Sequence, residues 1–213
     1  MRAQASFLEG GGECGALMRA KDWNSTELGP PESWPQSLRT AVSLLLNSRY
    51  PMFLFWGPQL IKIYNDGYRP ITGDKHPWAL GRPGPDVWPE IWADIGPMVE
   101  RVIHKGEATW SDDLPLFMRR RGFPEEVFFT FSYSPVRDES GGVGGMFCAC
   151  TETTAKVQGE RRLKVLRDLA AAAAEARTVA DACVRGVRVL AGVPADVPFA
   201  LLYLLEEGGP RLA

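Results

Sequence analysis

The chain has 213 residues, 45% of them hydrophobic and 23% charged, which suits one globular domain of ordinary size and a smaller unit. Its formal net charge of -2 excludes an overall field that would recruit nucleic acid or an anionic membrane. No apolar run approaches the roughly 20 residues of a membrane-spanning helix, and the N-terminus lacks the apolar segment of a secretory signal. Since its four cysteines are too scattered for a disulfide framework, we expect a reduced, cytoplasmic protein.

Residues 1–50 are predicted to form an N-terminal helical extension. A short helical piece is expected at residues 16–22, followed by a Pro-rich connector at residues 28–35. Ser33 and Pro35 then introduce a helix with four apolar residues on one face, Leu38, Val42, Leu45 and Leu46.

Residues 51–153 are rich in strand patterns at both ends and helical between them. Two short apolar runs split by Gly57 and Pro58 predict a hairpin of residues 52–56 and 60–64. Short helices are expected over residues 66–80, and a longer one over residues 89–105, which Gly106 ends.

Three further strands are predicted, at residues 108–117, 126–137 and 143–151. This order predicts an α+β fold, a five-stranded antiparallel sheet with helices packed over one face. The densest basic cluster, Arg119 to Arg121 beside Gly122, is expected to be a solvated hairpin loop rather than a phosphate site.

The remaining residues, 154–213, are predicted to be mostly helical. Apolar residues recur at helical spacing in the first helix, at Val157, Leu163, Leu166, Ala170 and Ala173. Thr178 and Asp181 form a capping box that starts a second helix, and a strand without a partner follows at residues 199–205. We therefore expect a linker helix and an incomplete second domain.

Two stretches of the middle region resemble a known family. Residues 65–82 read N-D-G-Y-R-P-I-T-G-D-K-H-P-W-A-L-G-R, and residues 134–154 read S-P-V-R-D-E-S-G-G-V-G-G-M-F-C-A-C-T-E-T-T. Both resemble a PAS domain of bacterial sensor histidine kinases, over residues 51–153. At the end of the predicted domain the sequence reads T-E-T-T-A-K. The family has a D-I-T-E-R-like motif at this point, so its Asp is displaced in this chain. The tail from about Glu160 is similar to the opening of a GAF domain.

This resemblance implies a pocket between the inner face of the sheet and the crossing helices. Eight residues are predicted to bind a ligand there: Tyr64, Asn65, Tyr68, His76, Trp88, Trp92, Trp110 and Phe131. Aromatic rings with one polar end suit a flat organic ligand; the alternative is that they are core or dimer-contact residues. The Asn65 amide is expected to fix the turn from hairpin to helix, and Gly73 and Gly81 to allow tight helix ends.

No cofactor is assigned from the sequence. His76 or His104 is a candidate haem ligand, although a lone histidine at a helix end is more often a cap or surface residue. Flavin photochemistry is not expected, because residues 83–88 lack the cysteine that it needs. Cys148 and Cys150 lie on one face of a strand and are interpreted as small buried hydrophobes rather than metal ligands.

The sequence therefore predicts a sensory input module without a catalytic domain, since neither histidine lies in a phospho-acceptor motif and no ATP-binding box is present. We expect it to bind a small molecule or partner in the pocket, to form a homodimer through its N- and C-terminal helices, and to relay the signal through the exit helix to a downstream kinase or other output domain. The alternatives are a ligand-free dimerisation and docking module, a haem-based sensor, and an enzyme, for which the sequence offers no convincing acid or nucleophile.

Overall fold

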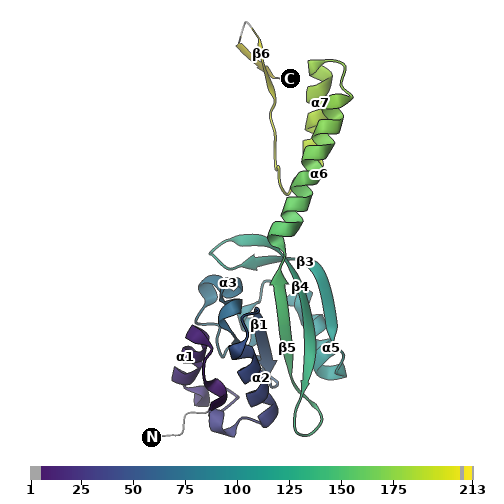
Figure 1. The fold of residues 1–213 in the computed structure, drawn as a ribbon. Helices are drawn as coiled ribbons and strands as arrows, with labels where there is room; N and C mark the ends of the chain where they lie inside the picture. The colour runs from purple at the N-terminus through teal and green to yellow at the C-terminus, as the bar shows by residue number, and fades with distance from the viewer. Residues whose placement is uncertain (1–5, 207–208, 213) are drawn as a thin grey trace. The chain divides into compact units, whose positions relative to one another are not determined.

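The computed structural model of the protein describes residues 6–206 and 209–212 (Figure 1). The chain divides into two compact units, Met1–Thr154 and Ala155–Ala213. Within the described residues, no helix is both long and apolar enough to cross a membrane.

The first unit begins with short helices. They are η1 (Ser6–Leu8), α1 (Gly12–Ala20), η2 (Trp23–Ser25), η3 (Pro31–Ser33) and α2 (Gln36–Asn47). The apolar face predicted for α2 is confirmed, since all four of its predicted core residues are buried. The preceding helix begins at Gly12, earlier than predicted, because a side chain from far along the chain caps it. Asp66 accepts hydrogen bonds from the backbone N–H groups of Glu13 and Cys14.

The predicted five-stranded antiparallel sheet is confirmed. Its strands are β1 (Met52–Trp56), β2 (Ile61–Tyr64), β3 (Thr109–Arg119), β4 (Pro124–Arg137) and β5 (Val143–Glu152), arranged in the order β2-β1-β5-β4-β3. The first strand in the chain, β1, thus pairs with the last, β5, in the interior of the sheet.

The segment between β2 and β3 is helical, as predicted. It contains η4 (Asp66–Tyr68), α3 (Arg69–Thr72), η5 (Gly73–Lys75), α4 (Gly84–Val87) and α5 (Trp92–Lys105). Gly106 ends α5 in the left-handed conformation with φ 66°, and its N–H donates to the carbonyl of Val102. Gly73 and Gly81 also have positive φ angles of 58° and 77°. The glycines therefore stand where the chain needs left-handed backbone.

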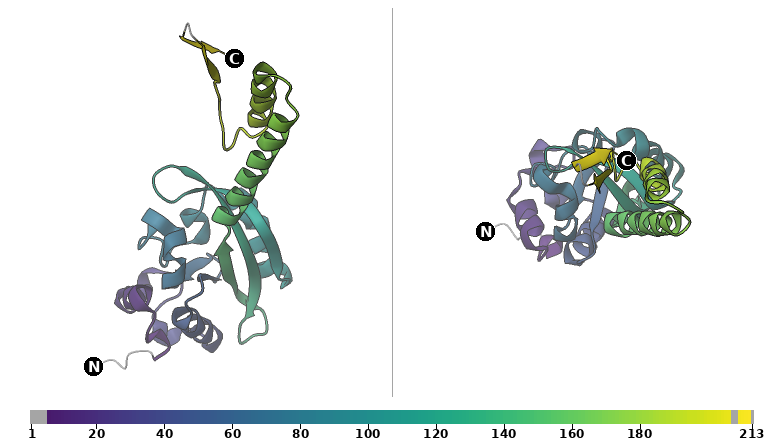
Figure 2. Two further views of the ribbon diagram at one scale, coloured as in Figure 1. Left: turned by 45° about the horizontal axis from the view of Figure 1, so that its top comes forward. Right: turned by 90° about the horizontal axis from the view of Figure 1, so that it is seen from above.

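Helices cover both faces of the sheet (Figures 1 and 2). On the inner face, cross-strand neighbours include Phe53 opposite Cys148, and Phe55 opposite Lys62; α5 packs on this face through Ile95. On the outer face, α2 of the N-terminal extension packs against β1 and β2. The extension therefore shares a core with the sheet instead of forming a separate layer.

In the Arg119–Arg121 cluster the prediction of a solvated loop is wrong for the central residue, whereas Arg119 and Arg121 are exposed. Arg120 is only 4% exposed, and its guanidinium is paired with Glu125 and Glu152. The hairpin is also tighter than predicted, since β3 continues to Arg119 and β4 begins at Pro124. The two carboxylates compensate for the burial of the charge, which an unpaired arginine would not tolerate.

The second unit contains α7 (Val179–Ala191), β6 (Tyr203–Glu206), β7 (Gly209–Leu212) and most of α6 (Thr154–Ala174). Thr178 caps α7 by accepting a hydrogen bond from the N–H of Asp181, as predicted. The strand expected at residues 199–205 begins only at Tyr203, and it has a partner. It pairs antiparallel with β7, so the prediction of an unpaired strand is wrong.

Candidate functional site

A small cavity lies between the inner face of the sheet and the helices that cross it. Its volume is about 30 Å³, which is room for about one water molecule. The wall is apolar and aromatic, and it includes Phe131, Tyr133, Cys148 and Cys150 from the sheet and Trp88 and Ile95 from the helical side. The interior in this conformation is therefore nearly filled by its own side chains.

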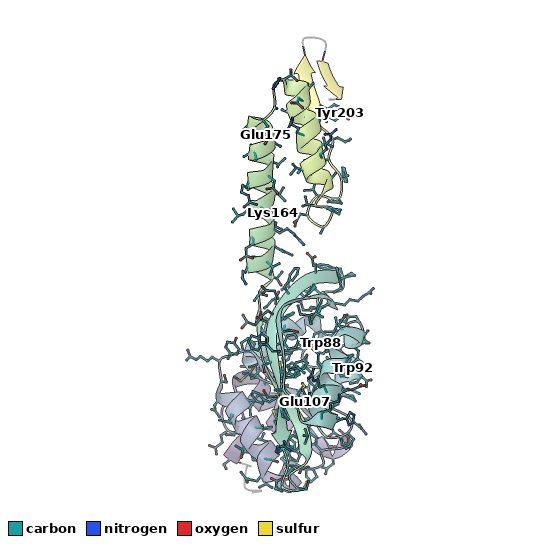
Figure 3. The ribbon with its side chains drawn as sticks, turned by 90° about the vertical axis from the view of Figure 1, so that its right-hand side faces the viewer. Trp88, Trp92, Glu107, Lys164, Glu175 and Tyr203 are labelled. Atoms are coloured by element: carbon teal, nitrogen blue, oxygen red, sulfur yellow. The ribbon has the colours of Figure 1, made fainter. Side chains whose placement is uncertain are left out.

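Three of the eight predicted ligand-binding residues, Tyr68, Trp88 and Phe131, line this cavity. Trp92, at the start of α5 (labelled in Figure 3), is half-buried and packs on Phe55 with ring centroids 6.2 Å apart. Trp110 lies outside the cavity. It is 62% exposed and stands opposite Ser132 on the other face of the sheet from Phe131.

Asn65 is a fully buried connector. Its Oδ1 accepts hydrogen bonds from the N–H groups of Met52 and Tyr68, each at 3.1 Å. Its Nδ2 donates to three carbonyl oxygens, those of Leu45, Ser48 and Tyr50. The amide therefore fixes the turn from β2 into η4, as predicted, and also holds the end of α2 against the start of β1.

Tyr64 and His76 form a hydrogen-bonded chain beside the cavity. The Tyr64 hydroxyl lies 2.8 Å from His76 Nδ1, and His76 Nε2 lies 3.1 Å from a carboxylate oxygen of Glu13, which also pairs with Arg69. Burial raises the pKa of the Tyr64 hydroxyl well above its usual value. Both ring nitrogens of His76 are engaged, so an iron atom would have to displace one of these partners.

His104 offers no better haem site, because it is exposed near the end of α5 and does not line the cavity. Cys148 and Cys150 are buried in the wall, as interpreted from the sequence, and burial raises the pKa of the Cys148 thiol. Among the described residues there is no group of three or more His, Cys, Asp or Glu side chains that is placed to hold a metal ion.

Sequence reasoning missed Lys62, the most unusual side chain of the interior. It lies on β2 with no solvent exposure, and its Nζ is 3.4 Å from the hydroxyl of Tyr68. Four aromatic rings surround the amine, with centroids 3.7 Å (Phe53), 4.4 Å (Tyr68), 5.0 Å (Phe55) and 5.6 Å (Trp88) away. Burial lowers the pKa of Lys62 to about 7. The sequence pattern that could have revealed its position is the alternation in I-K-I-Y, which puts Lys62 on the same face of the strand as Tyr64.

Sequence reasoning also missed the charge network at the end of the sheet. Arg120 Nη1 donates to Glu152 at 2.7 Å, and Glu152 accepts a second bond from the hydroxyl of Thr154, the first residue of α6. The same hydroxyl accepts from the N–H of Phe128 at 3.0 Å, and the Thr153 N–H donates to the Phe128 carbonyl. Partial burial opposes ionisation of Glu152, but its bonds to Arg120 and Thr154 hold its pKa below the usual range.

This network adjoins the cavity through the strands. Met118 and Cys150 line the cavity, and each stands two positions before a member of the network, Arg120 and Glu152. Because alternate residues of a strand share a face, the network continues the inner face beyond the cavity. The network therefore connects β3 and β5, which line the cavity, with the first residue of α6.

Comparisons with known proteins concern this first unit. Residues 53–158 match the family model described as PAS fold. No curated protein matches the sequence. Among solved structures, the chain is similar to the PAS domain of a protein from Colwellia psychrerythraea, with 13% identity and a TM-score of 0.43 over 55% of this chain and 97% of that one.

Two further structures share this likeness. A sensory box sensor histidine kinase from Vibrio cholerae aligns with 12% identity and a TM-score of 0.37, over 55% of this chain and 94% of that one. An RNA-binding Light-Oxygen-Voltage receptor aligns with 19% identity and a TM-score of 0.44, over 71% of this chain. The alignment spans only 43% of that receptor. At these identities the likenesses concern the fold alone.

Proposed function

Residues 53–158 form a PAS domain, and from this premise we propose that the chain is the input module of a signalling protein of the sensor histidine kinase type. In this proposal the inner cavity receives a small molecule, and the occupied cavity changes the way α6 begins. The output belongs to a downstream kinase or other domain, and the chain itself has no catalytic role.

The observation that carries this proposal is the network of Arg120, Glu152 and Thr154. The guanidinium of Arg120 is buried, so it has few acceptable geometries in which its charge keeps a partner. Strands that move at the cavity would either carry this network along or break it. In both cases the hydrogen bonds of Thr154 change, and with them the first turn of α6.

The second unit supports the remaining parts of the proposal. Leu163 and Leu166 of α6 are 67% and 62% exposed, which favours pairing of this helix with a second copy of the chain. The order of two helices, α6 and α7, followed by the strand β6 supports the start of a GAF-like domain from about Glu160.

A second candidate is a ligand-free dimerisation and docking module. The small volume of the cavity favours it, since a core with room for about one water molecule needs no ligand to be stable. Native mass spectrometry separates the two candidates, because only the sensor predicts a bound small molecule in at least one state of the protein.

A fusion of the full chain to a histidine kinase core tests the proposal. Ile95→Phe enlarges a side chain of the cavity wall and so imitates an occupied cavity. We expect this variant to change the autophosphorylation rate, and we expect Glu152→Gln to abolish that change. Glu107→Gln is the matched control, because Glu107 is half-exposed and pairs with Arg101 away from the network (Figure 3). An equal response with and without Glu152→Gln would overturn the relay.

A further inference from the structure

Three sulfur-containing residues line the inner cavity. Cys148 and Cys150 contribute thiols from β5, and Met118 contributes a thioether from β3. All three are at most 5% exposed, so water does not compete for their sulfur atoms. The other members of the wall are aliphatic or aromatic. The cavity therefore gathers soft ligand atoms in an otherwise apolar interior.

The two thiols are close enough to interact. They lie on one face of β5, and burial together with the neighbouring Cys150 thiol raises the pKa of Cys148. A disulfide between them is disfavoured, because alternate Cα atoms of an extended strand are about 6.6 Å apart, at the upper limit for a disulfide. An ion held between two sulfur atoms spans a longer distance than an S–S bond. The pair is therefore better arranged to share an ion than to oxidise.

A buried amine stands beside the thiols. Burial lowers the pKa of Lys62, but both thiols favour its charged form. The rings of Phe53 and Tyr68, with centroids 3.7 and 4.4 Å from Nζ, favour that form as well. No carboxylate is among the groups that act on this pKa. Thiolates at Cys148 and Cys150 would supply the negative charge that the ammonium lacks.

We propose that the inner cavity binds one copper(I) ion, with Cys148 and Cys150 as thiolate ligands and Met118 as a thioether ligand. This inference rests on the proposed sensory function and names the ligand of its cavity. The volume of about 30 Å³ has room for about one water molecule, and a single metal ion needs no more. Thiolate and thioether donors select soft copper(I) over hard cations.

The donor set also separates copper(I) from zinc. A structural zinc site takes four ligands from Cys, His and carboxylate side chains. Among the residues that the structure describes, no third His, Cys, Asp or Glu joins the two cysteines. Copper(I) is held by two or three sulfur atoms, which the cavity supplies. The cavity therefore meets the needs of copper(I) and not those of zinc.

Binding leaves the site electrically neutral. Each thiol gives up its proton, so the two thiolates and the ion together carry one net negative charge. The Lys62 ammonium neutralises this charge, which a buried site requires. The metal is bound as copper(I), so no electron is transferred and no oxidant or reductant is needed.

Ligation would also supply the signal. It ties β5 to β3 through Cys150 and Met118, each of which stands two positions before a member of the Arg120 network. The ion would thereby fix the relative position of the two strands that carry this network.

Anaerobic titration of the full chain with copper(I), in competition with the chromophoric chelator bicinchoninate, tests this inference. We expect one ion per chain, and X-ray absorption of the wild-type complex should show sulfur as the only ligand atom. Cys148→Ala should weaken binding by at least about a hundredfold, since the loss of an outer-shell partner alone can cost that much. Cys14→Ala is the matched control, because Cys14 is also buried but lies in α1, outside the cavity wall.

Methionine variants test the third ligand. Met118→Leu conserves the volume of the side chain and should weaken binding by about tenfold, because the thioether is lost. Met146→Leu is the matched control and should leave the affinity unchanged, since Met146 is buried on β5 but does not line the cavity. Equal affinities of the two variants would overturn the role of Met118.

Nitrogen or oxygen ligands in the X-ray absorption spectrum, or no copper retained against the chelator, would overturn the inference. These wild-type measurements decide it even if Cys148→Ala does not fold. They also do not depend on the kinase fusion. Failure to bind copper beside an intact response of the fusion to Ile95→Phe would reject the ion and leave the relay standing, whereas copper binding without that response would reject the relay alone.

Discussion

Replacing Asn65 with alanine should destabilise the first unit by about 4 kcal/mol. The substitution removes five hydrogen bonds, two of them buried and three partly buried. A buried backbone group left without a partner costs about 1–3 kcal/mol, while a partly buried group recovers most of this from water. The loss therefore comes mainly from the carbonyl of Leu45 and the N–H of Tyr68.

Urea unfolding followed by circular dichroism measures this loss. With a slope of about 2 kcal/mol per molar urea for a unit of this size, the midpoint should fall by about 2 M. Asn47→Ala is the matched control, because Asn47 is exposed and makes one hydrogen bond, to the Ser43 carbonyl. Its midpoint should shift by an amount corresponding to less than about 0.5 kcal/mol.

Asn65→Asp sharpens the test. It keeps the two acceptor bonds but turns a carboxylate toward three carbonyl oxygens, so it should be unstable at neutral pH. Its stability relative to wild type should recover as the pH falls and the carboxylate is protonated. An Asn65→Ala variant as stable as Asn47→Ala would refute the reasoning, since the buried bonds would then be replaced at no cost.

Four further predictions follow from the charges and close contacts. The Lys62 amine should titrate near pH 7 by NMR, and wild type should gain stability relative to Lys62→Met as the pH rises above 7, because the unfolded chain then binds the extra proton; a midpoint near 10 contradicts this. Arg120→Met should cost about 2 kcal/mol in urea unfolding, since it removes the ion pairs of a buried guanidinium with Glu125 and Glu152, and a neutral effect would contradict this. Asp66→Asn should destabilise at pH 7 but hardly below pH 3, because hydrogen bonds to the N-terminus of α1 outweigh burial and lower the pKa of Asp66; an equal loss at both pH values argues against it. Gly73→Ala should lower the midpoint of thermal unfolding, because its Cβ would lie 2.3 Å from the Arg120 carbonyl at a φ of 58°. Gly122→Ala, whose Cβ meets no atom within 4 Å, should lose only the stability that its positive φ costs.

The sequence predicted those features that depend on local chemistry. The Gly57-Pro58 hairpin, the end of α5 at Gly106 and the apolar face of α2 all follow from turn residues and periodicity. Asn65 was predictable as a cap because it follows a strand and precedes a helical pattern. Its three donor bonds to residues 45–50 were not, because they join segments that only the folded chain brings together.

The parts that escaped prediction depend on partners far away in the chain. Arg120 looked like a loop residue because Glu152 is 32 positions away. Lys62 was not singled out from the sequence, since lysine is almost never fully buried without a paired charge. Trp110 was predicted to line the pocket as one of its aromatic residues, but the pairing of β3 shifts between Ser111 and Leu114, where Asp113 adopts a φ of 45°. Such an irregularity changes the face on which the preceding residues lie.

Hydrogen exchange at the start of α6 tests the central claim most directly. The Thr153 N–H is bonded to the Phe128 carbonyl at 2.8 Å, and the adjacent Thr154 hydroxyl belongs to the Arg120 network. The account predicts that Ile95→Phe, which alters only the cavity wall, changes the exchange of amides 153–156, and that Glu152→Gln removes this effect. Exchange that changes around Ile95 but stays the same at residues 153–156 would contradict a relay from the cavity to the exit helix.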